Sequence, residues 1–197
     1  MQNFGLYEFA EQNDPAGDEL WRTGSPKKVA LSLLEGYNDS VREIVHRTND
    51  EDMYLWHVKE RLPLPSFHNG RLVLLGDAAH PMHPTLGAGA ACAFEDAAVL
   101  GVLLRDVHDL SMVPSRLALY DAQRRPRASA VQLLSQSDSM WYTISEDIQK
   151  MTKELIPAKD WPEPLTRPNV NHWVFKFDCV AEAEKALENL RRDSAVV

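Results

Sequence analysis

One segment constrains the fold more than any other: residues 72–75 are all apolar, and the run ends abruptly at Gly76 and Asp77. A short strand that is apolar at every position is usually buried on both faces, as in a parallel sheet. The loop that follows contains proline and glycine, and residues 88–104 are rich in alanine and predict a helix. This order of strand, loop and helix predicts an α/β fold whose ligand binds beyond the carboxyl end of the strand.

The flanking sequence predicts several helices and a few short strands. Ser25 and Pro26 are a favourable helix start, and this helix is expected to reach about Arg47, although Gly36 weakens its middle. Pro126 is expected to bend or divide the helix predicted from about residue 114 towards residue 140. The other predicted elements are strands at residues 4–9, 53–58 and 173–177, an extended crossing at residues 156–168, and an amphipathic helix at residues 181–191.

The composition is typical of a soluble globular protein, since 44% of the 197 residues are apolar and 25% are charged. A formal net charge of -8 argues against nucleic acid as a partner, because phosphate binding depends on clustered Lys and Arg. No signal peptide is recognised, and Glu95 and Asp96 interrupt the longest apolar run, so no membrane partner is expected. With only Cys92 and Cys179, the chain fits a reducing compartment, and we expect it to be cytoplasmic.

The end of the apolar run has the residues for a ligand site. The Asp77 carboxylate can accept hydrogen bonds from sugar-like hydroxyls, and Gly87 and Gly89 let the backbone pass close to a flat ligand. The free N–H groups and the dipole of the following helix favour negative charge on that ligand. The structural alternative is a turn in which Asp77 only caps a helix.

A metal site is the other chemical interpretation of this loop, since Asp77, His80 and His83 recur at every third residue. Pro81 and Pro84 prevent a regular helix there, and no set of Cys or Glu ligands lies nearby. The sequence therefore predicts no metal, and His80 is interpreted as a loop residue that hydrogen-bonds to the backbone.

Glu95 and Asp96 lie inside the apolar, alanine-rich helix. An unpaired buried carboxylate is costly, so these residues are expected to form ion pairs that join two helices. The candidate partners are Arg124, Arg125 and Arg127 on the next helix. Tyr120, Trp141 and Tyr142 are interpreted as core aromatic residues, and Cys92 as a small packing residue.

These residues resemble a known family. The string from Gly76 to Met82, the following Pro-x-x-Gly-x-Gly-Ala, and Glu95-Asp96-Ala97 with Leu100 resemble the second flavin-binding motif of single-component aromatic-ring monooxygenases. The salicylate hydroxylase-like branch is the most similar. Residues 120–127 also resemble that family, and the resemblance covers roughly residues 21–136.

The resemblance implies an oxidoreductase that binds FAD, takes electrons from NADH or NADPH and hydroxylates a small aromatic substrate. It implies that Asp77 binds the ribityl chain and that Pro84 and Thr85 lie beside the isoalloxazine ring. The pyrimidine edge of the ring would lie against Gly87, Ala88, Gly89 and Ala90. No catalytic residue is assigned, because the family's substrate contacts mostly precede the residues of this chain.

The sequence departs from the family pattern in two respects. It contains no Gly-x-Gly-x-x-Gly, the fingerprint that holds the FAD pyrophosphate, and the family's Asp-Gly motif is also missing. The resemblance therefore implies the C-terminal portion of a Rossmann-like, three-layer FAD/NAD(P)-binding fold that lacks its N-terminal βαβ unit and is mostly helical in its C-terminal half. The domains would be the tail end of a substrate-binding domain (residues 1–65), an FAD-binding segment (residues 66–145) and a C-terminal extension (residues 146–197).

Two functions follow from these observations. The first is a truncated FAD-dependent monooxygenase, which alone would bind FAD weakly or not at all because the pyrophosphate cradle is absent. The second is a non-catalytic remnant of that fold, which acts as a structural or interaction module. An uncovered sheet edge would favour pairing with another chain, so a homodimer is a candidate assembly.

Overall fold

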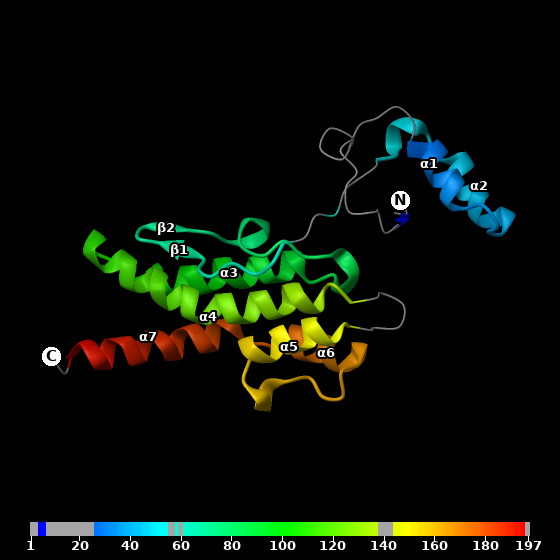
Figure 1. Cartoon of the computed structure of the whole chain (residues 1–197). Helices are drawn as coiled ribbons and strands as arrows, with labels where there is room; N and C mark the ends of the chain where they lie inside the picture. Colours follow the sequence, from blue (N-terminus) through cyan, green and yellow to red (C-terminus); the bar gives the residue numbers. More distant parts are fainter. Residues whose placement is uncertain (1–3, 7–25, 55–57, 59–60, 138–143, 196–197) are drawn as a thin grey trace. The chain divides into compact units, whose positions relative to one another are not determined.

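Helices make up most of what the computed structural model describes, which is residues 4–6, 26–54, 58, 61–137 and 144–195 (Figure 1). The chain divides into two compact units, Met1–Val58 and Lys59–Val197. None of the helices in the described ranges combines the length and the apolar character needed to cross a bilayer. The prediction of a mostly helical C-terminal half is confirmed.

The first unit contains two short helices, α1 (Pro26–Leu33) and α2 (Asp39–Arg47), and the 3-10 turn η2 (Asp50–Asp52). The single helix predicted from residue 25 to residue 47 is therefore wrong. Gly36 adopts a left-handed φ of 82°, which ends α1, and the Asn38 side chain caps α2 by accepting from the Ser40 amide at 2.8 Å. Ala30, Leu34 and Val45 form the small core of this unit.

Neither strand predicted near this unit is seen in the described residues. Residues 4–6, 53, 54 and 58 have no strand structure, and the remaining positions of the predicted strands at 4–9 and 53–58 lie outside the described ranges.

The second unit begins with a hairpin in which β1 (His68–Asn69) pairs antiparallel with β2 (Leu72–Val73). Gly70, at a φ of 60°, makes the turn between them. The prediction that residues 72–75 lie in a parallel sheet, buried on both faces, is wrong for the described structure. Leu72 is 64% exposed and Leu75 is 41% exposed, because within the described ranges β2 pairs with β1 alone.

Helix α3 (Gly89–Leu104) follows the 3-10 turns η3 (Gly76–Ala78) and η4 (Pro84–Leu86), which confirms the helix predicted at residues 88–104. Another 3-10 turn, η5 (Leu110–Met112), leads into α4 (Val113–Leu134). Helix α4 runs without interruption through Pro126, so it is not divided there. Helices α3 and α5 both pack against α4, and this tertiary packing outweighs the local cost of the proline.

The chain continues through α5 (Glu146–Leu155), the turn η6 (Ala158–Asp160), α6 (Arg167–Phe175) and α7 (Cys179–Ala195). Contacts between α3 and α7 join the C-terminal helix to this unit. The helix predicted at residues 181–191 is confirmed within α7. The strand predicted at residues 173–177 is wrong, because residues 173–175 form the last turn of α6.

Residues 156–168 contain the turn η6 and the first residues of α6 rather than one extended crossing.

Two apolar clusters form the core of the second unit. The first joins the hairpin, α3, α4 and α7 through Phe67, Val99, Leu103, Tyr120 and Leu187. The second anchors the loop before α3, since Leu86 and Ala88 pack with Cys92, Val131 and Val174.

Candidate functional site

The chain reverses sharply at the turn of residues 76–80, directly after β2. Gly76 adopts a left-handed φ of 57°, and its carbonyl accepts from the amides of Ala79 at 2.8 Å and His80 at 2.9 Å. A Cβ atom on Gly76 would lie 3.4 Å from the Cβ of Ala93 in α3. The turn therefore favours glycine through both its backbone conformation and its close approach to α3.

Asp77 is exposed at this turn. Within the described ranges no hydrogen bond or ion pair engages its carboxylate, and the turn η3 has no side-chain cap. The structural alternative in which Asp77 only caps a helix is therefore not what the structure shows. Its carboxylate remains available as a hydrogen-bond acceptor at the end of β2.

The loop of residues 83–87 is fixed by α4 and α6. The His83 amide donates to the Ser135 hydroxyl at 3.0 Å, and the Thr85 hydroxyl donates to the Ser135 carbonyl. From α6, the Arg167 guanidinium donates to the Thr85 carbonyl at 2.8 Å. The Thr85 side chain is thus engaged within the protein, whereas the neighbouring Pro84 is exposed.

The start of α3 is open. Gly87 has a left-handed φ of 63°, and a Cβ atom on Gly87 or Gly89 would meet no other group within 4 Å. Ala88 is buried in the core, so it offers only its backbone, while Ala90 is exposed. No side chain caps this helix and its first turn has no acidic residue, so its free N–H groups and positive dipole end can act on a ligand.

The exposed carboxylate and the open helix end lie on neighbouring parts of the fold. The turn η3 packs against α3, with Gly76 beside Ala93. Gly89 precedes Ala93 by about one helical turn, which is roughly 6 Å along the helix axis. The turn that carries Asp77 therefore lies against the first half of α3.

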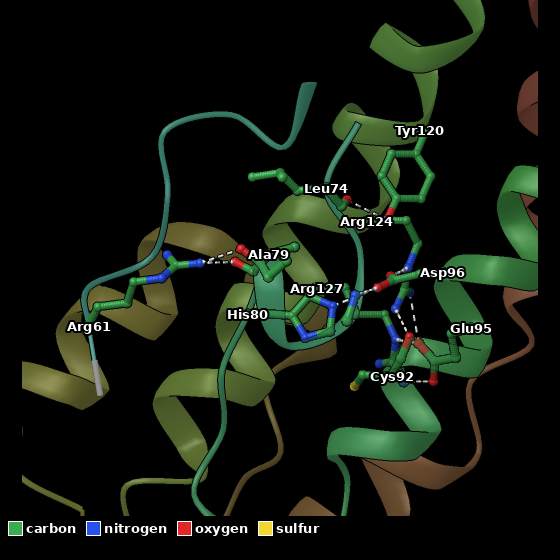
Figure 2. A network of polar contacts seen from close by, with 12 residues as sticks. Arg61, Leu74, Ala79, His80, Cys92, Glu95, Asp96, Tyr120, Arg124 and Arg127 are labelled. Atoms are coloured by element: carbon green, nitrogen blue, oxygen red, sulfur yellow. Dashed lines mark hydrogen bonds and ion pairs between the residues drawn. The ribbon is translucent and has the colours of Figure 1, made fainter. Parts of the chain in front are cut away.

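Asp96 lies behind this turn and is completely buried. Its Oδ2 accepts from the Gly76 amide at 2.9 Å and from His80 Nε2 at 2.6 Å, and its Oδ1 accepts from Arg124 Nε at 2.8 Å (Figure 2). Burial favours a higher pKa for Asp96, but the His80 hydrogen bond, the Arg124 charge and the Gly76 amide together lower its pKa below the ordinary value. Asp96 is therefore an ionised acceptor, and Nε2 of His80 carries a proton.

Glu95 extends this network across three helices. It forms ion pairs with Arg124 at 2.7 Å and with Arg127 at 2.8 Å. Arg127 also donates to the Val174 carbonyl of α6 at 2.7 Å and stacks over the rings of two residues, Trp173 and Phe177. The predicted ion pairs between α3 and α4 are thus confirmed for Arg124 and Arg127.

Two other predictions about this region are wrong. Arg125 does not pair with the α3 carboxylates but with Asp121, four residues earlier on α4, in a partly buried pair. His80 is not a loop residue bound to the backbone through its ring, because its ring is fully buried and donates to Asp96. The side chain of Asp96 satisfies this histidine more strongly than a carbonyl would, since a carboxylate is a charged acceptor.

Arg61 also binds this turn, and no sequence pattern predicted its role. Its guanidinium donates to the carbonyls of Ala78 at 3.0 Å and Ala79 at 2.8 Å (Figure 2). Gln132 of α4 donates in turn to the Arg61 carbonyl at 2.8 Å. These contacts join residues that are far apart in the chain, and no local spacing pattern encodes them.

The other residues considered in the sequence, Tyr120 and Cys92, lie in the protein core. Tyr120 lies in the core and donates from its hydroxyl to the Leu74 carbonyl at 3.2 Å, which confirms its interpretation as a core residue. Burial raises the pKa of the Cys92 thiol to about 12, so it stays protonated at neutral pH, as expected of a packing residue. Trp141 and Tyr142 lie outside the described residues. Among the described residues, no group of three His, Cys, Asp or Glu could hold a metal ion.

Comparison with known proteins assigns the chain to a family. Residues 31–135, just over half of the chain, match the model of a family described as an FAD binding domain. This chain belongs to the FAD-dependent monooxygenase family. Its members are oxidoreductases that use FAD, and the matched range includes the turn at Gly76, the open start of α3 and most of α4.

Individual relatives place the chain within this family. It is 36% identical to the FAD-dependent monooxygenase phomE′ of Diaporthe leptostromiformis over 97% of this chain and 46% of that protein. It is 40% identical to 6-hydroxynicotinate 3-monooxygenase of Pseudomonas fluorescens over 62% of this chain and 31% of that protein. A solved salicylate hydroxylase substrate complex matches with a TM-score of 0.57 and 27% identity, over 91% of this chain and 40% of that one.

The chain thus spans less than half the length of the family members it matches. The family assignment applies to the part of the fold that carries the turn and the helix start described above. The activity and the substrate of a complete family member are matters of proposal for this chain.

Proposed function

We propose that this chain forms the ribityl and ring side of the flavin site of an FAD-dependent monooxygenase. The observation that supports this most strongly is the exposed Asp77 carboxylate, which has no partner among the described residues and belongs to a turn packed against α3, whose start is uncapped. An acceptor for hydroxyl groups and a set of free N–H donors are the two kinds of group that the sugar chain and the carbonyl edge of a flavin require.

The residues divide the task between them. Asp77 accepts hydrogen bonds from ribityl hydroxyls, and the glycines at 87 and 89 leave room for the ring to approach the backbone. Pro84 and Thr85 give the ring a surface to lie against. The Thr85 hydroxyl already donates to the Ser135 carbonyl, so Thr85 serves the ring as a packing surface and not as a hydrogen-bond donor. Ala88 and Ala90 contribute their backbone beside the pyrimidine edge.

The start of α3 also fits the charge that develops on a reduced flavin. A helix N-terminus stabilises a nearby negative charge by about 0.3–1 kcal/mol, and by more where the geometry is partly buried. When bound, FAD supplies the transfer of electrons from NADH or NADPH to oxygen that this family uses for hydroxylation. The chain's own contribution is to orient the ring and to place donors where negative charge appears.

We propose a small aromatic molecule as the substrate class. Relatives of this chain are named for 6-hydroxynicotinate and salicylate, both of which are aromatic acids. In this proposal residues 66–145 are the FAD-binding segment, residues 1–65 the end of a substrate-binding domain and residues 146–197 a C-terminal extension. The printed sequence has no Gly-x-Gly-x-x-Gly, so the described residues hold the ring and ribityl end of FAD and not its pyrophosphate.

A second candidate is a non-catalytic module that binds another protein chain. Phe94 on α3 is 76% exposed and Leu72 on β2 is 64% exposed, and exposed apolar side chains mark a contact surface where they gather into one patch. This candidate predicts no flavin binding, so the same experiment separates the two.

The test is a titration of the purified chain with riboflavin and with FAD, followed by quenching of flavin fluorescence. Riboflavin contains the ring and the ribityl chain, so it should bind about as tightly as FAD if the described residues hold only that end. Replacing Asp77 with alanine removes a hydrogen bond to a charged group, worth about 1.5–3 kcal/mol, and should weaken binding roughly tenfold to a hundredfold.

The matched control is Asp193→Ala, which removes an exposed carboxylate from α7 and should leave flavin binding unchanged. Absence of flavin binding by the unmodified chain, or equal affinities for Asp77→Ala and Asp193→Ala, would refute the proposed function.

A further inference from the structure

We propose that Asp96 is a positioning residue of the flavin site, which fixes the turn of residues 76–80 so that Asp77 is presented to the ribityl chain. This inference rests on the proposed function and adds to it a buried residue that touches no ligand itself. The supporting observation is that one carboxylate oxygen of Asp96, Oδ2, binds both ends of the turn.

The geometry of that oxygen is specific. Oδ2 of Asp96 accepts from the Gly76 amide, which begins the turn, and from the His80 ring, which ends it. The Gly76 carbonyl closes the turn from within by accepting from the amides of Ala79 and His80. Asp77 lies between these fixed ends, and its own side chain has no described partner that could orient it.

Asp96 also joins the two halves of the proposed site. It belongs to α3, whose open N-terminus is one half, and it holds the turn that carries Asp77, which is the other. Its second oxygen is fixed by Arg124, which in turn donates to the Cys92 carbonyl at 3.3 Å. A shift of α3 relative to the turn would break at least one of these contacts.

The chemistry at this position requires a carboxylate. Three donors, namely the Gly76 amide, His80 Nε2 and Arg124 Nε, converge on two oxygens that can only accept. A carboxamide offers one oxygen and one NH2 group, so at least one donor would face another donor in a fully buried space. Because Arg124 is charged, the oxygen should remain with Arg124, and the turn should lose its anchor.

Glu95 provides a matched control on the same helix. It pairs with the same Arg124 and also with Arg127, but no contact joins its side chain to residues 76–80 in the described structure. Asp96→Asn and Glu95→Gln therefore remove the same charge from the same network, and only the former releases the turn.

The experiment measures riboflavin affinity and hydrogen exchange of the Gly76 amide in the full chain. We expect Asp96→Asn to weaken riboflavin binding by at least about tenfold and to accelerate Gly76 exchange, while Glu95→Gln lowers the Tm without either effect. In an Asp77→Ala background, Asp96→Asn should have no further effect on affinity, because a positioning residue acts through the residue that it positions.

His80→Gln is the second variant, and it keeps the inference testable if Asp96→Asn fails to fold. It removes the ring at one end of the turn and leaves the pair of Asp96 and Arg124 intact, so the same direction of change is expected with a smaller size.

Three outcomes would overturn the inference: equal affinities for Asp96→Asn and Glu95→Gln, equal Gly76 exchange in the two variants, or effects of Asp96→Asn and Asp77→Ala that simply add. Failure of the proposed function has a different signature, because the unmodified chain would then bind no riboflavin. In that case hydrogen exchange of the Gly76 amide still tests whether Asp96 fixes the turn. Faster exchange in Asp96→Asn than in Glu95→Gln supports this role of Asp96, and equal exchange in the two variants overturns it.

Discussion

At the scale of single residues, Gly76 is a position where both the backbone conformation and the surroundings favour glycine. It combines a left-handed φ of 57° with a neighbouring Cβ atom only 3.4 Å from where its own would lie. The sequence signals this position, since a glycine directly after an apolar run and before an aspartate is the core of the motif. The approach of Ala93, by contrast, depends on how α3 packs and is visible only in the structure.

Gly76→Ala should therefore destabilise the chain. A residue other than glycine in the left-handed region costs about 1–2 kcal/mol, before any adjustment of α3. In thermal unfolding this should appear as a Tm lowered by several degrees. Gly101→Ala is the control, because Gly101 lies in α3 with open space around it, and alanine there should raise the free energy of unfolding by about 0.5–1 kcal/mol. Equal Tm changes in the two variants would show that the Gly76 conformation is not required.

The lowered pKa of Asp96 gives the stability of the chain a defined pH dependence. Above its ordinary pKa of 3.8 this carboxylate is ionised in both states, and its contacts contribute fully to stability. As the pH falls below 3.8, the unfolded chain binds a proton that the folded chain still excludes, so the free energy of unfolding decreases. Urea unfolding of Asp96→Asn should therefore depend less steeply on pH in this acidic range than unfolding of the unmodified chain. Parallel pH profiles for the two proteins would contradict the assignment.

At the scale of elements, Arg127 is the side chain that joins α4 to both α3 and α6. It is almost fully buried, pairs with Glu95 and donates to the Val174 carbonyl. Its stacking over Trp173 and Phe177 adds cation–π contact with the end of α6 and the residues after it. The position of α6 thus depends on a residue that the sequence marked only as one of three candidate partners.

Arg127→Ala should lower the free energy of unfolding by about 3–5 kcal/mol, because it breaks a buried pair and exposes two aromatic rings. Arg125→Ala is the comparison, since the Arg125 side chain is 31% exposed against 6% for Arg127, so its pair with Asp121 should contribute less to stability. Chemical denaturation of both variants measures the difference. Similar losses in the two would mean that Arg127 does not join the helices.

The helices were predictable from sequence where periodicity and end signals agreed. The alanine-rich run at α3 and the amphipathic run within α7 are of this kind. The segment at residues 173–177 misled the interpretation, because its aromatic and β-branched residues suit a strand. Pro168 near the start of α6 and the buried pair Val170 and Val174, at a spacing of four residues, were the helical signals that prevailed.

The break between α1 and α2 shows a second limit of the sequence. Gly36 was recognised as a weak point, but a glycine within a helix and a glycine that ends one have the same local composition. Asn38, which caps α2, was the additional signal that a new helix begins.

At the scale of the whole molecule, the motif was predictable from the sequence, but the tertiary contacts that hold it in place were not. Asp77 and the glycines at 87 and 89 belong to one ordered string of residues over a short stretch, and that string resembles the family's motif. The contacts of Asp96 and Arg61 with the turn join distant segments, and their pairing emerges only when α3 and α4 pack together. The exposure of Leu72 and Leu75 was missed for a related reason, because burial of a strand depends on which other strands are present to cover it.

The most direct test of the account is to map riboflavin onto the chain by backbone amide chemical shifts. We expect the largest shifts at residues 76–80 and 87–91, in the turn that carries Asp77 and at the start of α3, and we expect them to be much smaller in Asp77→Ala at the same riboflavin concentration. Shifts that concentrate on other elements, or that persist unchanged in Asp77→Ala, would contradict the claim that these two features together hold the flavin.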